Sequence, residues 1–126
     1  MDVSKYKDLF ASESREHLQA LTEAILDLER EPGSVEPLER IFRSAHTLKG
    51  MAATMGYEGM SQLARDMEDL LDKGRQGTLA VAPALIDLLS ECVDVLNTML
   101  GDIIAERESQ VNLAAVLHKL KQYQPA

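Results

Sequence analysis

The strongest constraint on this chain is the spacing of its apolar residues, which recur every three or four positions through almost all of its 126 residues. This period matches one face of an α-helix, whereas a half-buried strand needs strict alternation of apolar and polar residues. Leu18, Leu21, Ile25 and Leu28, for example, follow one another at steps of three, four and three. Because no segment shows the alternating pattern, the spacing predicts an all-α fold.

Glycine and proline residues divide this pattern into five segments, because both residues interrupt helices. Pro32 and Gly33 end the first segment, Gly56 ends the second, and Gly74 and Gly77 mark the end of the third. The predicted helices cover about residues 4–31, 35–55, 58–75, 83–107 and 110–122.

The expected helix starts carry suitable N-terminal residues. Ser34 is an N-cap candidate for the second helix, and Pro37 falls in its first turn, where a missing N–H costs little. Ser109 is the expected cap of the fifth helix. Short connections favour antiparallel packing of neighbouring helices. We therefore expect residues 1–126 to form a single domain, an antiparallel four-helix bundle with an additional short C-terminal helix.

Composition narrows the range of partners. The formal net charge of -8 would repel a phosphate backbone, so we do not expect nucleic-acid binding. Cys92 is the single cysteine and falls on an apolar helix face, which excludes a disulfide framework and favours core packing. No apolar run is long enough to span a membrane, and the first residues do not resemble a signal peptide. We expect a cytoplasmic domain without membrane contact, monomeric in isolation.

Metal and nucleotide chemistry have no clear signal in the sequence. A carboxylate-bridged metal centre in a bundle needs Glu-x-x-His pairs on two helices, and neither His17 nor His118 belongs to such a pair. The glycine-rich phosphate loop G-x-x-x-x-G-K-[ST] is also absent. We therefore expect no metal and no cofactor in this domain.

The second predicted helix carries a histidine beside its buried face. On a helical wheel His46 lies roughly 120° from the centre of that face, which places it on the rim, within reach of solvent. Gly50 lies roughly 160° from the same centre, one turn further on. An outward glycine inside a helix costs stability without helping core packing, so we expect something outside the domain to approach closely there.

A carboxylate on the third predicted helix has the matching position. Glu68 follows the buried-face residue Met67 by one place, as His46 follows Ala45, so antiparallel helices could bring the two side chains together. A carboxylate that accepts a hydrogen bond from Nδ1–H would fix the imidazole tautomer and leave Nε2 as a nucleophile. Lys49, on the same side of the helix, could offer its ammonium group to phosphoryl oxygens.

The wheel positions alone leave three alternatives open. The first is a solvated rim histidine with an unrelated glutamate nearby, as in a noncatalytic helical adaptor whose Gly50 surface receives a partner helix. The second is a metal-dependent enzyme built on a helical bundle. The third is an activated histidine that carries a phosphoryl group.

The run HTLKGMAATMGY at residues 46–57 resembles the signature of histidine phosphotransfer (HPt) domains. In that family a histidine is followed by Ser or Thr, Leu or Ile, Lys and Gly, then by small residues, a glycine and an aromatic residue. The resemblance extends to segments of the first and third predicted helices and to the residues just before His46. In these segments the chain is similar to the N-terminal domain of CheA-type chemotaxis kinases. The residues concerned are Phe10, Glu13, Leu18, Leu28 and Glu29, the run Ile41-Phe42-Arg43, and the run Met67-Glu68-Asp69-Leu70-Leu71.

This resemblance implies specific roles for the residues already singled out. His46 would be the phosphoacceptor, Glu68 its hydrogen-bonding partner, Lys49 a phosphate or network residue, and Gly50 the clearance for docking partners. The phosphoryl group would come from ATP with Mg²⁺ on a separate histidine kinase domain. It would pass to an aspartate of a CheY-like response-regulator receiver domain in a two-component, chemotaxis-type signalling system.

One position departs from the family pattern. Many relatives have a second histidine one turn before the glutamate, where this chain has Arg65. An arginine cannot accept a hydrogen bond, but it could pair with Glu68 at the i, i+3 spacing or reach toward a bound phosphoryl group. Arg65 is therefore a candidate substitute in the His46 network.

Overall fold

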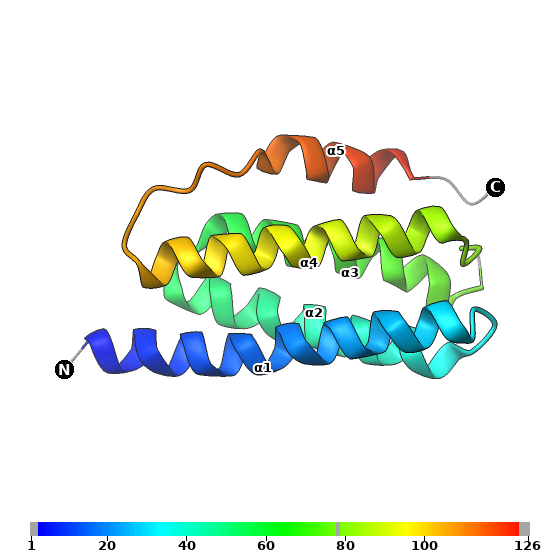
Figure 1. Ribbon diagram of the computed structural model, residues 1–126, viewed down its shortest axis with the longest axis horizontal. Helices are drawn as coiled ribbons and strands as arrows, with labels where there is room; N and C mark the ends of the chain where they lie inside the picture. Colours follow the sequence, from blue (N-terminus) through cyan, green and yellow to red (C-terminus); the bar gives the residue numbers. More distant parts are fainter. Residues whose placement is uncertain (1–2, 78, 124–126) are drawn as a thin grey trace.

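The computed structural model describes residues 3–77 and 79–123, which form a bundle of helices (Figure 1). As predicted, the fold is an antiparallel four-helix bundle with a short additional helix, and the described residues contain no strand. The helices are α1 (Val3–Arg30), α2 (Val35–Met55), α3 (Glu58–Arg75), α4 (Pro83–Ile104) and α5 (Leu113–Gln122).

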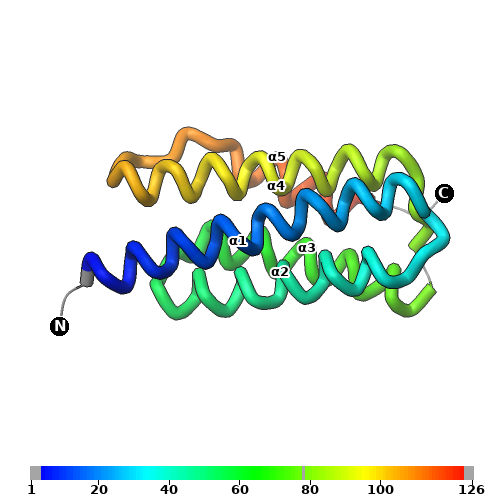
Figure 2. The backbone as a smooth tube through the Cα atoms, turned by 60° about the horizontal axis from the view of Figure 1, so that its bottom comes forward, coloured from blue at the N-terminus to red at the C-terminus, as the bar shows by residue number. Residues whose placement is uncertain are grey.

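The four long helices enclose one apolar core, to which α5 adds a smaller contribution. Leu21 on α1, Leu48 on α2, Leu63 on α3 and Leu89 on α4 are all buried in it, as the helical period requires. In Figure 2, α1 runs obliquely across the bundle, with α4 above it and α2 below it. Helix α5 packs on α3 and α4. No helix in the described part of the chain has the length and apolarity needed to cross a membrane.

The turn after α2 sets the direction of α3. Gly56 adopts a left-handed conformation with φ of 79°, and the amide of Tyr57 donates to the carbonyl of Ala52 at 2.8 Å. This is a Schellman-type ending, in which glycine is favoured because it has no Cβ. The predicted stop at Gly56 is confirmed, and Ser34 occupies the N-cap position of α2, although its side chain makes no capping hydrogen bond.

Two helix ends differ from the prediction. Helix α4 ends at Ile104 rather than near residue 107, because Glu106 takes a left-handed conformation with φ of 55°. A non-glycine residue in this conformation gives no signal in the sequence. Helix α5 begins at Leu113 rather than near residue 110. Its cap is Asn112, whose side chain accepts from the amide of Ala115, and not Ser109 as predicted.

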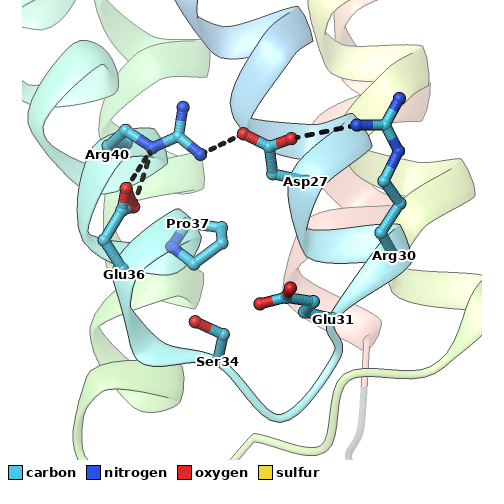
Figure 3. Close-up of a pocket in the computed structure, with 7 residues that line it drawn as sticks. All are labelled: Asp27, Arg30, Glu31, Ser34, Glu36, Pro37 and Arg40. Carbon is cyan, nitrogen blue, oxygen red and sulfur yellow. Dashed lines mark hydrogen bonds and ion pairs between the residues drawn. The ribbon is translucent and has the colours of Figure 1, made fainter.

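The corner between α1 and α2 is held by ion pairs (Figure 3). Arg40 of α2 pairs with Asp27 of α1 and with Glu36 of its own helix, and Arg30 pairs with Asp27 at 3.5 Å. These residues line a surface pocket together with Glu31, Ser34 and Pro37. Arg40 is paired with two carboxylates, and its pair with Asp27 links α2 to α1. We therefore interpret this pocket as part of the connection between the two helices.

Candidate functional site

His46 lies in the middle of α2 with an accessible side chain. Its side chain is 61% exposed, whereas Ala45 and Leu48 on the same helix are buried. The wheel prediction of a rim position is therefore confirmed. An imidazole in this position can be reached by another protein while its helix remains packed in the bundle.

Glu68 of α3 contacts the imidazole from the facing helix. The Nδ1 atom of His46 and the Oε2 atom of Glu68 are 3.3 Å apart, and the Glu68 side chain is only 16% exposed. The expected proximity of the two residues is confirmed. With Nδ1 as the donor, the neutral ring has its lone pair on Nε2. Among the described residues, no hydrogen bond is made by Nε2.

Lys49 belongs to the same group of side chains. Its Nζ atom lies 2.9 Å from Oε2 of Glu68, so the ammonium group and the imidazole share one carboxylate oxygen. The hydroxyl of Ser61 on α3 donates to the backbone carbonyl of Lys49 at 3.2 Å, which adds a second link between the helices here. The carboxylate therefore bridges two residues of α2 that are three positions apart.

The charge state of Glu68 follows from these contacts. Partial burial by itself raises the pKa of the carboxyl, because it disfavours the charged form. The hydrogen bonds from Lys49 and His46, together with the positive charges of these two side chains, outweigh that effect, so the pKa of Glu68 lies below its ordinary value of 4.5. Glu68 is an ionised acceptor at neutral pH and can stabilise positive charge on the imidazole.

The helix surface at Gly50, one turn after His46, is open to solvent. A Cβ atom built on Gly50 would have no neighbouring atom within 4 Å, and the position is exposed. The hydroxyl of Thr54 donates to the carbonyl of Gly50 at 2.9 Å and so is directed back to its own helix. The outward orientation predicted for Gly50 is confirmed.

An apolar groove between α1 and α2 adjoins Gly50. Its lining includes Tyr6 and Leu9, whose exposed fractions of 48% and 56% are large for apolar side chains. Met51 and Met55 line the α2 side of the groove. The surface beside His46 is therefore open and partly apolar.

Arg65 does not make the contact considered for it. Its guanidinium group donates to the side chain of Gln62 at 3.1 Å, one turn earlier on α3, and its side chain is exposed. In the part of the chain that the structure describes, Arg65 forms no ion pair with Glu68. Lys49 occupies the cationic position beside Glu68 instead.

Phe42 adjoins His46 and Arg75 contacts Phe42, and the sequence pattern singled out neither of them as a site residue. The ring of Phe42, one turn earlier on α2, is parallel to the imidazole within 7°, with centroids 6.3 Å apart. The guanidinium carbon of Arg75 on α3 lies 4.0 Å from the centroid of the Phe42 ring. The available signal was the helical spacing, since Phe42 precedes His46 by four residues and Arg75 follows Glu68 by seven.

Comparisons with known proteins identify the family of this chain. The family model of the Hpt domain matches residues 5–106, which is most of the chain. The chain therefore belongs to the Hpt domain family. The match includes all of the His46 group and stops before α5.

The relatives are chemotaxis proteins. The chemotaxis protein CheA of Bacillus subtilis (strain 168) is 42% identical over 120 residues, which are 95% of this chain and 18% of that protein. The chain thus spans less than a fifth of the length of this relative.

Solved structures share the bundle. The solution structure of the histidine phosphotransfer domain of CheA has a TM-score of 0.88 at 31% identity, covering 99% of this chain and 96% of that one. The phosphorylated P1 domain of CheA3 in complex with CheY6 from R. sphaeroides has a TM-score of 0.83. It is 21% identical, and the match covers 93% of each chain, so this likeness concerns the fold.

Proposed function

We propose that this domain is the phosphocarrier of a CheA-type two-component system, with His46 as the phosphoacceptor. The observation that carries the proposal is the exposed imidazole whose Nδ1 is held by the partly buried carboxylate of Glu68. This contact supports both the tautomer and the orientation that a nucleophilic Nε2 requires. Membership of the Hpt family and the CheA relatives support the same role.

In the first transfer, the lone pair of Nε2 attacks the γ-phosphorus of ATP. A phosphorus–nitrogen bond forms while the bond to the bridging oxygen of ADP breaks, and ADP leaves with that electron pair. Positive charge develops on the ring, and the carboxylate of Glu68, hydrogen-bonded at Nδ1–H, stabilises it. Lys49, whose ammonium group contacts the same carboxylate, would offer its charge to the phosphoryl oxygens.

The ATP belongs to another domain in this proposal. The chain has no G-x-x-x-x-G-K-[ST] loop. A separate histidine kinase domain would bind ATP and Mg²⁺ and present the γ-phosphoryl group to His46. The length of the CheA relative, of which this chain spans 18%, supports a kinase domain elsewhere in a longer protein. We assign the reaction to the cytoplasm, since the buried free thiol of Cys92 suits a reducing compartment.

In the second transfer, an aspartate of a receiver domain attacks the phosphorus and the phosphorus–nitrogen bond breaks, which returns the electron pair to Nε2. The receiver would dock over Gly50 and the adjoining apolar groove. The open space at Gly50 and the exposed Tyr6 and Leu9 support this surface, because a docking partner needs both clearance and apolar contact. The complex of the CheA3 P1 domain with CheY6 supports the class of partner.

The test is a labelling experiment with the His46→Gln variant. Wild-type protein and variant are incubated with a CheA-type kinase domain and ATP labelled at the γ-phosphate. We expect label on the wild type that survives base and is lost in acid, as a phosphoramidate should be, and none on the variant. Equal labelling of the two proteins would remove His46 from the reaction and favour a noncatalytic adaptor.

A second arm of the experiment addresses Glu68. In Glu68→Ala the hydrogen bond to Nδ1 is lost, so the labelling rate should fall by about 10²-fold or more, while the helical content measured by circular dichroism persists. An unchanged rate would remove Glu68 from the mechanism but not His46.

A further inference from the structure

Arg75 of α3 contacts Phe42, the aromatic neighbour of His46. The guanidinium carbon of Arg75 lies 4.0 Å from the centroid of the Phe42 ring, a distance at which a cation and an aromatic face attract each other. Arg75 is itself held by two carboxylates, through a contact of 2.9 Å to Glu39 of α2 and one of 3.5 Å to Asp72 of α3. The guanidinium group therefore has a defined position between the two helices.

The Phe42 ring in turn lies beside the imidazole. The two rings are parallel within 7°, and their centroid distance of 6.3 Å is in the range of offset-stacked aromatic pairs. Phe42 is only half-buried and packs at the edge of the core, so its ring is not fixed by core packing alone. Contact with Arg75 supplies the additional restraint.

A single hydrogen bond leaves the imidazole some freedom. The contact between Nδ1 and Glu68 fixes one point of the ring, and the ring can still pivot about that point because the terminal torsion of histidine is broad. A flat neighbour parallel to the ring restricts the pivoting. The direction of Nε2, on the far side of the ring, depends on this second restraint.

We infer that Phe42 and Arg75 are positioning residues for His46, with Arg75 acting through the ring of Phe42. The inference rests on the proposed function, because it concerns the aim of the nucleophile in that reaction. Transfer to an incoming phosphoryl group is sensitive to the direction of approach, so a freely pivoting imidazole reacts more slowly. Glu68 activates the ring, and the pair of Phe42 and Arg75 orients it.

The test compares three variants with a matched control. Phe42→Leu keeps an apolar side chain without the flat ring, Arg75→Met removes the guanidinium group, and Phe42→Tyr keeps the ring. Arg40→Met is the control, because Arg40 also pairs with two carboxylates between helices but contacts no aromatic ring in the described structure. Circular dichroism establishes that each variant remains helical.

The first measurement is the initial rate of labelling in the assay described above. We expect Phe42→Leu and Arg75→Met to slow labelling between about twofold and tenfold, the range that corresponds to loss of one aromatic contact. Phe42→Tyr and Arg40→Met should label at the wild-type rate. Wild-type rates in both Phe42→Leu and Arg75→Met would overturn the inference, and so would an equal loss of rate in Arg40→Met.

The second measurement does not depend on phosphorylation. The ring-proton and ring-nitrogen resonances of His46 report its neighbouring ring and its tautomer, and we expect both Phe42→Leu and Arg75→Met to shift the ring-proton resonances. Unchanged resonances in these two variants would overturn the inference. The His46→Gln variant separates this result from the proposed function. If it labels like the wild type, the phosphoacceptor proposal fails while the resonances still decide whether Phe42 and Arg75 orient the ring.

Discussion

Glu68 has two partners on one carboxylate oxygen. The imidazole of His46 and the ammonium group of Lys49 both contact Oε2, at 3.3 and 2.9 Å. The sequence pattern related Glu68 to His46 but assigned Lys49 to the phosphoryl group or a hydrogen-bond network. In the structure the ammonium group of Lys49 contacts Glu68, and this contact contributes to the lowered pKa of Glu68.

The lowered pKa makes a prediction about pH. Because the pKa of Glu68 is lower in the folded chain than its ordinary value of 4.5, the ionised group stabilises the fold above that pH, and the contribution is lost as the pH falls below it. Urea unfolding should therefore find the wild type more stable than Glu68→Gln at pH 7. The difference in the free energy of unfolding should shrink well below pH 4.5. An equal difference at both pH values would contradict the assigned shift.

At the scale of elements, α2 combines two kinds of surface. Its buried face carries Ile41, Ala45, Leu48 and Ala52, and its outer face carries a glycine that no packing contact requires. Gly59 of α3 offers a comparison, since a Cβ there would lie 2.7 Å from the end of the Met99 side chain. Internal packing therefore accounts for the glycine at position 59 but not for the one at position 50.

Gly50→Ala should stabilise the domain. Alanine reduces the conformational freedom of the unfolded chain and meets no atom within 4 Å in the helix. We expect the free energy of unfolding to rise by about 0.5–1 kcal/mol. Urea unfolding gives the value, and Gly59→Ala is the control in which no such gain is expected. A loss of stability in Gly50→Ala would show that the position is not open in solution.

At the scale of the whole molecule, α5 packs on a bundle that α1 to α4 already close. Val116 and Leu120 are its buried residues, and Lys119 pairs with Glu91 of α4 at 2.9 Å. The family model ends at residue 106, before this helix. Few buried residues and a long connection indicate that α5 opens more easily than the four-helix core.

Leu120→Ala tests this view of α5. Removing most of a buried leucine side chain lowers the free energy of unfolding by about 2–5 kcal/mol where the structure cannot relax. We expect this loss to weaken the packing of α5 on α3 and α4 rather than the four-helix core. Hydrogen exchange should speed up in the amides of α5 while those in the middle of α2 and α4 stay protected. The exposed Lys121→Ala serves as the control. Equal acceleration in all helices would mean that α5 unfolds together with the bundle.

Much of the architecture could be predicted because its causes are local. The period of the apolar residues determined the all-α fold and the buried faces, and the same period placed His46 on the rim. The left-handed turn at Gly56 was predictable because glycine is favoured in it. The end of α4 was not, because Glu106 takes a left-handed conformation that its residue type does not signal.

The sequence by itself determined which residues face the core and which helix carries the accessible imidazole. Only the tertiary structure decided the partners of the charged and aromatic side chains around it: Lys49 with Glu68, Arg65 with Gln62, and Arg75 with Phe42. The physical reason is that burial follows from the period of one helix. The choice among several reachable partners depends instead on the register between two helices and on the rotamers of long side chains.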